Sequence, residues 1–264
     1  MPEPPACDES LATRVAAARR WIRLLGHSPT ERHGIMVVST PAHPLVFEAN
    51  FMMAKSGAEF ATPGATLGES AGGNGCHMAY VDCLTRPSMI EAFERCGLRP
   101  GSTLTEMSAT AICLTRQLPS VSARLVDKRL WPTLIALIEA NFYEGKQVRD
   151  SDRDVVKGLV EIARRRAIGC KYWLIELDGD IAGYGMTAVC PNRLGLIEDL
   201  FTKPNARGLG VMSAFIRAAW RHLEAAGCDA VFLDALHSGR PAQLYRSLGF
   251  HPVTTSILLI RASS

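Results

Sequence analysis

The stretch that decides the fold is Leu196–Met212, with the sequence LIEDLFTKPNARGLGVM. It begins as a strand, turns at Pro204, and enters a long amphipathic helix through Arg207-Gly-Leu-Gly210. Glycines at such a junction let the backbone approach a ligand closely, and the first helical turn offers unpaired N–H groups and a positive dipole end. These residues predict an anion site, although a helix that merely begins with glycines would look the same. The pattern is neither a Walker sequence nor G-x-G-x-x-G, which argues against nucleotide triphosphates and dinucleotides.

Strands and helices alternate on both sides of this stretch. A tight turn at Asp178-Gly179 predicts a β-hairpin. The arginines at 164–166 end a helix that begins with acidic residues, which suits the helix dipole and does not indicate a nucleic-acid patch. Periodicity predicts strands at 122–126, 171–177, 181–189, 194–202, 230–236 and 256–260, and helices at 130–141, 150–166, 211–226 and 241–248.

A second signature lies downstream, where Tyr245 is followed by a short helix end and Gly249-Phe250. Together with Arg207-Gly-Leu-Gly210, it makes residues 121–264 resemble the GNAT superfamily of acyl-CoA-dependent N-acyltransferases. The resemblance implies an α/β fold with a mixed, mostly antiparallel sheet flanked by helices. Met212 departs from the family loop, where Gly or Ala is usual, and Ser238 stands where many relatives carry Asn.

The resemblance also implies how acetyl-CoA, the expected co-substrate, binds. Its pantetheine would pair with the end of the strand at 200–202 like an added strand, and its pyrophosphate would lie on the amides that open the helix. The donor-binding residues implied in this way are Leu200, Phe201, Thr202, Arg207, Gly208, Leu209, Gly210, Val211, Met212 and Ser238.

Two residues are predicted to be catalytic. The family's equivalent of Tyr245 lies beside the cofactor sulfur, so its hydroxyl is expected to protonate the departing thiolate; a core tyrosine is the alternative. Glu198 is the candidate base, acting directly or through water with a pKa raised by partial burial, unless it simply pairs with an arginine. Strand alternation places Asp199 on the opposite face. His237 is a weaker candidate for the base.

The first half of the chain contains a fainter copy of the second. Residues 79–100 and 231–252 align without gaps, with Asp82 matching Asp234 and Gly97 matching Gly249. We therefore expect two tandem GNAT-like units: a degenerate one at 1–118 without an acyl-CoA loop, and a catalytic one at 119–264. An amphipathic helix at 9–26 opens the first unit, and its glycine-rich stretch at 56–75 is expected to be a surface loop.

Composition limits the remaining possibilities. Apolar residues make up 47% of the 264 residues, and the net charge of +3 is too small to favour nucleic-acid or membrane partners. The eight cysteines form no C-x-x-C pair, so we expect buried thiols and no metal site. The first residues lack the features of a signal peptide, and no apolar run is long enough to span a membrane; both favour the cytoplasm.

The sequence thus predicts an acetyl-CoA-dependent N-acetyltransferase in which a primary amine attacks the thioester directly within a ternary complex. The acceptor, a small molecule or a peptide, is not specified, and an oligomer is compatible with the sequence. The alternatives are a transferase for a longer acyl-CoA and a non-catalytic acyl-CoA sensor or scaffold, which would have no need for Tyr245 and Glu198.

Overall fold

The computed structural model describes residues 10–59, 76, 78–113, 121–236 and 240–261. The first half contains α1 (Leu11–Leu24), β1 (Thr30–Arg32), β2 (Ile35–Val38), the 3₁₀ turn η1 (Phe47–Ala49), β3 (Phe51–Ala54), β4 (Met78–Val81), α3 (Pro87–Arg95) and β5 (Leu98–Ala109). The second half contains β6 (Val121–Leu125), α4 (Trp131–Tyr143), α5 (Asp150–Arg166), β7 (Cys170–Leu177), β8 (Asp180–Val189), β9 (Leu194–Thr202), the turn η2 (Pro204–Ala206), α6 (Val211–Ala225), β10 (Ala230–Leu236), α7 (Arg240–Ser247) and β11 (His251–Arg261).

The described strands form one sheet in the order β1-β2-β3-β4-β11-β5-β10-β9-β8-β7-β6. Most pairs are antiparallel; the parallel ones are β3 with β4 and β9 with β10. Helices flank the sheet, so the predicted GNAT-like α/β fold is confirmed. The hairpin of β7 and β8 turns at Asp178 and Gly179, whose φ angles of 53° and 88° suit a two-residue turn with positive φ at both positions.

The two halves exchange strands across the middle of the sheet. β11, from the end of the chain, lies between β4 and β5, while β5 lies between β11 and β10. The two segments that echo each other in sequence both form strand, short helix and strand: β4, α3 and β5 in one copy, and β10, α7 and β11 in the other. The predicted division into two units at residue 118 stays a prediction. Strands from before and after this residue belong to the same sheet.

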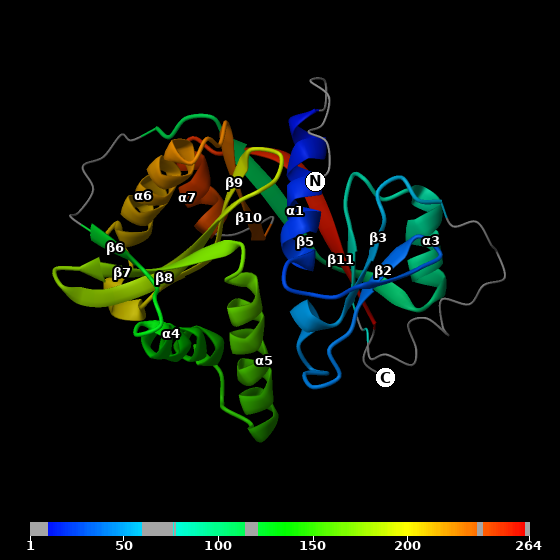
Figure 1. Ribbon diagram of the computed structural model, residues 1–264, viewed down its shortest axis with the longest axis horizontal. Coiled ribbons are helices and arrows are strands. Elements are labelled where there is room, and N and C mark those ends of the chain that lie inside the picture. The colour runs from blue at the N-terminus through cyan, green and yellow to red at the C-terminus, as the bar shows by residue number, and fades with distance from the viewer. Residues whose placement is uncertain (1–9, 60–75, 77, 114–120, 237–239, 262–264) are drawn as a thin grey trace.

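Helix α1 stands between the two lobes, as Figure 1 shows. Its apolar stripe of Val15, Ala18 and Ile22 packs into the core of the second half, together with residues of β9 and β10. The opposite face of the sheet carries a second core formed with α6 and α7. Helix α1 is therefore part of the C-terminal core, although it belongs to the N-terminal half of the sequence.

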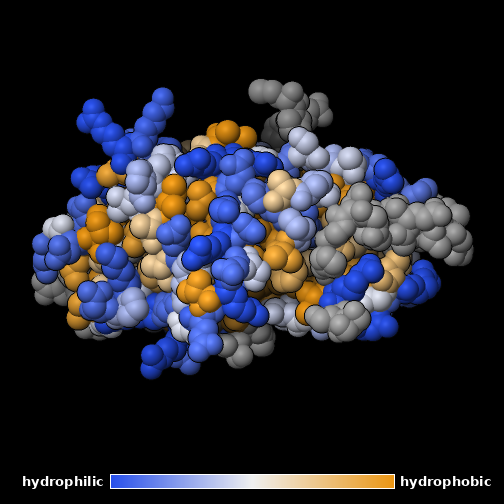
Figure 2. All heavy atoms as spheres, turned by 90° about the horizontal axis from the view of Figure 1, so that it is seen from below, coloured by the Kyte–Doolittle hydropathy of each residue, from blue (hydrophilic) through white to orange (hydrophobic). Residues whose placement is uncertain are grey.

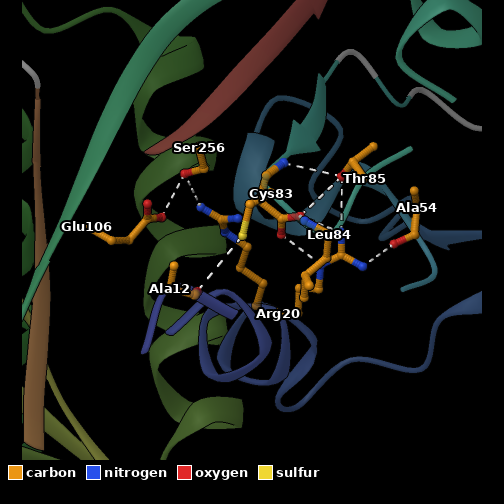
Figure 3. Close-up of polar contacts among 10 residues, drawn as sticks. Ala12, Arg20, Ala54, Cys83, Leu84, Thr85, Glu106 and Ser256 are labelled. Carbon is orange, nitrogen blue, oxygen red and sulfur yellow. Dashed lines mark hydrogen bonds and ion pairs between the residues drawn. The ribbon is translucent and has the colours of Figure 1, made fainter. Parts of the chain in front are cut away.

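The polar face of α1 is also buried, which the amphipathic pattern did not predict. Arg19, Arg20 and Arg23 are only 2%, 7% and 5% exposed. Arg20 contacts two segments of the first half (Figure 3): its Nε donates to Oδ2 of Asp82, just after β4, at 2.7 Å, and its Nη1 donates to the carbonyl of Ala54, at the end of β3, at 2.8 Å. This ion pair fixes α1 to the first half of the sheet.

Three further features concern the helices, the molecular surface and the cysteines. Among the described residues, no helix is long and apolar enough to cross a membrane. The lower face of the molecule shows hydrophobic and hydrophilic residues interspersed (Figure 2). The seven cysteines that the structure describes are all free thiols.

Replacing Arg20 by methionine should destabilise the protein by about 3–5 kcal/mol, because Asp82 would remain buried without its counter-charge. Lys55 provides a control, since its ion pair with Glu31 is exposed and contributes about 0–1 kcal/mol. Urea denaturation of Arg20→Met, Lys55→Met and the wild type measures the difference. A loss below about 1 kcal/mol for Arg20→Met would show that α1 is not held by this pair.

Candidate active site

The junction after β9 has the geometry that the sequence predicts for an anion site. Gly208 and Gly210 have φ angles of 77° and 82°, values that residues other than glycine rarely adopt. Gly210 is the N-cap of α6. Among the residues that the structure describes, no side chain caps this helix end. The first-turn N–H groups of α6 are thus available to a negatively charged ligand.

A hollow of about 950 Å³ lies against this helix end; we call it the large hollow. Its lining includes Thr202, Gly210, Met212, Pro241 and Tyr245, so it reaches from the end of β9 along α6 to α7. Both the start of α6 and the predicted catalytic tyrosine therefore border one space.

The predicted donor-binding residues differ in what they offer to this hollow. Leu200 and Met212 line it with half-buried side chains, whereas Phe201 and Val211 are core residues, 4% and 1% exposed, that can contribute only main-chain groups to a ligand. Leu209 is 53% exposed. The predictions for Ser238 and His237 lie outside the described residues.

Arg207 holds the loop and is not free to follow a ligand. Its Nε donates to the Thr202 carbonyl at 3.0 Å, and its two terminal nitrogens form a bidentate ion pair with Glu144, just after α4. The arginine of the motif thus connects the end of β9 to the α4–α5 connection and shapes one side of the large hollow.

Strand β9 leaves β10 near its end but stays paired with β8 across an irregularity. Its pairing with β10 covers only Leu194–Leu196, after which no described pairing continues. On the other side, Tyr184 pairs with Phe201 and Met186 with Glu198, so two residues of β9 lie opposite one residue of β8. This is a β-bulge, and Asp199 within it has a φ of 53°.

The bulge overturns the expectation that Glu198 and Asp199 point to opposite faces. Both line a hollow of about 340 Å³ together with Asp234 and Tyr245; we call it the acidic hollow. Strand alternation fails here because the bulge adds a residue to β9 and breaks the period of two. Leu200, Pro241 and Tyr245 border both this hollow and the large one, so the two are adjacent.

Glu198 is held by Arg19 of α1, a residue that the sequence analysis did not single out. Arg19 Nη1 donates to Glu198 Oε1 at 2.8 Å, and its other nitrogens lie 3.3 Å from Asp234 Oδ2 and 4.0 Å from Glu106 Oε1. Burial alone would raise the pKa of Glu198, but the guanidinium groups of Arg19 and Arg166 bring that pKa below its usual value. The expected rise in the pKa of Glu198 is therefore wrong.

Asp199 has the opposite environment. Asp199 has an exposed face, but the surrounding walls remove part of its solvation, and this loss together with the neighbouring charge of Glu198 raises the pKa of Asp199 to about 6. The Tyr172 hydroxyl lies 3.5 Å from Asp199 Oδ2 and is its one hydrogen-bond partner among the described side chains. The pKa of Glu198 is thus lowered and that of the adjacent Asp199 is raised. Such a difference between neighbouring carboxylates lets them take different roles in acid–base chemistry.

Tyr245 borders both hollows. It lies on α7, is 6% exposed, and packs against Phe250 with ring centroids 6.3 Å apart. Burial, and next the charge of Asp234, raise the pKa of its hydroxyl to about 12, so the group is protonated at neutral pH. The phenol is therefore able to donate a proton.

The comparisons with known proteins identify the class. Residues 131–250 match the model of the acetyltransferase (GNAT) family, and this part of the chain belongs to that family. A mycothiol acetyltransferase from Thermomonospora curvata is 38% identical over 79 residues, which are 30% of this chain and 27% of that protein.

Solved structures extend the likeness to nearly the whole chain. A GCN5-related N-acetyltransferase from Kribbella flavida aligns with a TM-score of 0.70 at 15% identity, covering 97% of this chain and 98% of that one. A functionally unknown conserved protein from Staphylococcus epidermidis aligns with a TM-score of 0.62 at 10% identity, covering 90% and 95%. At these identities the likeness concerns the fold, and it includes both halves.

No metal is indicated by the geometry. The described residues contain no group of three or more His, Cys, Asp or Glu side chains arranged to hold an ion. The candidate site consists of a helix end, two carboxylates and a phenol.

Replacing Arg19 by methionine should raise the pKa of Glu198, because burial would then act with less compensation from positive charge. Carbon-13 NMR titration of the glutamate carboxyls measures this shift. Arg19→Lys should keep most of the wild-type value, and Arg14→Met, which removes an ion pair with Asp229 and a hydrogen bond to the Asn192 carbonyl, should leave it unchanged. An unaltered pKa for Glu198 in Arg19→Met would show that Arg19 does not lower the pKa of this carboxyl.

Proposed function

We propose that the chain transfers an acetyl group from acetyl-CoA to a primary amine by direct attack within a ternary complex. The observation that carries the proposal is a pair of adjacent hollows that share Tyr245: one lies at the glycine-opened end of α6 and the end of β9, and the other is lined by the carboxylates of Glu198, Asp199 and Asp234. Membership of residues 131–250 in the GNAT family supports the same activity.

The donor would occupy the large hollow. Its pyrophosphate would lie on the first-turn amides of α6, where helix dipole and free N–H groups favour anions. Its pantetheine arm would pair with main-chain groups at Leu200–Thr202, on the side where β9 has left β10. A main-chain N–H of the same segment would then stabilise the oxyanion that forms on the thioester carbonyl.

The amine would approach from the acidic hollow. Its nitrogen must lose a proton before it attacks, and of the two carboxylates Asp199 is better suited to accept it because its pKa lies closer to neutrality. We therefore transfer the role of base from Glu198 to Asp199. Glu198, kept ionised by Arg19, would hold the ammonium form of the acceptor before the proton leaves.

The reaction closes with the departure of the thiolate. The neutral amine attacks the thioester carbonyl, and the new N–C bond forms as the tetrahedral intermediate is created. Its collapse breaks the C–S bond, and the sulfur takes a proton from the hydroxyl of Tyr245, which is restored by the second proton that leaves the amide nitrogen. The carboxylates and the phenol favour catalysis over a sensor that only binds acyl-CoA, because binding alone requires neither group.

Gly210→Val should weaken acetyl-CoA binding at least tenfold, which is about 1.4 kcal/mol, because the side chain would enter the approach to the helix end. Gly227→Val is the matched control: Gly227 follows α6 at its other end, has a φ of 86°, and has no atom within 4 Å of an added Cβ. Calorimetric titration compares both variants. Equal affinities for acetyl-CoA in both would remove the assignment of the pyrophosphate site.

The value of kcat/KM should fall as the pH drops below about 6, because protonated Asp199 is unable to accept the proton of the amine. Above that pH the carboxylate is ionised and the limitation disappears. Asp199→Asn should lower kcat/KM about a hundredfold and abolish this limb of the profile, whereas Asp229→Asn, an exposed aspartate on the other side of α1, should retain it. A limb that persists in Asp199→Asn would assign the base elsewhere.

Tyr245→Phe should lower kcat about a hundredfold, the low end of the ~10²–10⁴ range for general acid catalysis, because water assists a good leaving group such as a thiolate. Binding of acetyl-CoA should stay within about threefold, since the anion site lies at α6. The loss should shrink for a donor with a more acidic leaving thiol. Wild-type turnover in Tyr245→Phe, with chemistry shown to be rate-limiting, would make this residue part of the core only.

A further inference from the structure

A third cavity, of about 250 Å³, lies next to Asp199; we call it the Arg166 cavity. It lies between α4, α5 and strands β7 to β9, and η1 of the first half contributes Glu48. The polar side chains that line it are those of Glu48, Asn141, Arg166, Tyr172, Tyr184 and Asp199. Asp199 thus borders both this cavity and the acidic hollow.

Arg166 is the unusual member of this set. It is only 9% exposed, its Nε is buried without a hydrogen-bond partner, and its guanidinium forms no hydrogen bond or ion pair with any residue that the structure describes. Glu198 and Asp199 attract it from a distance. Buried polar groups in folded proteins nearly always have partners, and a charged group is the costliest exception. An unpaired, buried guanidinium that lines a cavity indicates an anionic ligand.

The neighbouring hydroxyls are arranged to help such a ligand. Tyr184 accepts a hydrogen bond from Asn141 Nδ2 at 3.1 Å, which leaves its own proton free to be donated into the cavity. Burial raises the pKa of both Tyr172 and Tyr184 and keeps them protonated. A carboxylate beside Arg166 would therefore meet a bidentate cation and a hydroxyl donor together.

The charges define the ligand further. One cation, Arg166, faces two carboxylates, Asp199 and the exposed Glu48, so the cavity as a whole does not favour a dianion. It suits a molecule that places an amine beside Asp199 and a carboxylate beside Arg166. The walls between them are apolar, formed by Ile138, Leu159 and Ile162.

We propose that the amine acceptor also carries a carboxylate, as an amino acid does, and that Arg166 binds this carboxylate while the amine lies at Asp199. This inference rests on the proposed function, because the amine at Asp199 is the one that would attack the thioester. It makes Arg166 a residue that determines substrate specificity.

The test compares acceptors that differ only in the anionic group, assayed with the full-length chain and acetyl-CoA by free-thiol release. Suitable sets are leucine, leucinamide and 3-methylbutylamine, together with the corresponding sets for phenylalanine and lysine. We expect at least one amino acid to be acetylated with a kcat/KM at least about tenfold above that of its amide and its decarboxylated amine. Equal or better use of the uncharged analogues throughout would overturn the proposal.

Variants then assign the preference to Arg166. Arg166→Met should lower kcat/KM for the preferred acid at least about tenfold and leave the amide within about threefold, and Arg166→Lys should restore part of the difference. Arg164→Met, exposed on the same helix, is the control. Equal losses for acid and amide would show that Arg166 is structural. If Arg166→Met does not fold, Tyr184→Phe keeps the packing and should reduce the same acid-to-amide ratio.

Calorimetry separates this proposal from the proposed function. The same acids and amides are titrated into the protein saturated with CoA, which requires no acetyl transfer. Preferential binding of an acid that disappears in Arg166→Met would support the carboxylate site even if no acceptor were acetylated, in which case only the proposed function would fail. Absence of any such preference in both assays would overturn the carboxylate site.

Discussion

The structure depends on a single buried guanidinium. Arg19 is 2% exposed and lies among Glu106 of β5, Glu198 of β9 and Asp234 of β10, so one cation from α1 attracts carboxylates on three strands. Removing the cation would leave several carboxylates buried without compensation, a situation that costs several kcal/mol. The carboxylates and α1 therefore require one another, and the acidic hollow exists only where the two halves meet.

This dependence gives the first half of the chain a role without requiring it to bind acetyl-CoA. It contributes α1, which supplies Arg19, and β5, which carries Glu106 and lies between β10 and β11. Ser256 of β11 donates a hydrogen bond to Glu106 at 2.8 Å, which links the exchanged strands at the same point (Figure 3).

The regular elements of the second half could be predicted because local patterns determine them. The helix Asp150–Arg166 and the strands Leu194–Thr202 and Ala230–Leu236 have the predicted bounds. Strand β11 was expected at 256–260 but begins at His251, since its first residues, which include Pro252, are polar and become a strand only by pairing with β5 across a bulge. The predicted glycine-rich loop lies mostly outside the described residues.

The chemistry of the site was less accessible from the sequence, and for physical reasons. Periodicity assigned Asp199 to the wrong face because the bulge in β9 is produced by strand pairing and is not visible in the order of residues. In the sequence, Arg19 looks like a solvated residue on the polar face of an amphipathic helix, and Arg166 looks like a basic residue that ends a helix. Both are buried by elements that are distant in sequence. Buried arginines on predicted polar faces could have been found only from tertiary contacts.

We propose that the chain holds a single acyl-donor site, in its second half, beside an acidic hollow whose carboxylates are held by a helix of the first half. Calorimetric titration of acetyl-CoA into the full-length chain tests it most directly. We expect one acetyl-CoA per chain, because the glycine-opened helix end occurs at α6 and the first half lacks the corresponding sequence. Two equivalents per chain, or none, would contradict the claim.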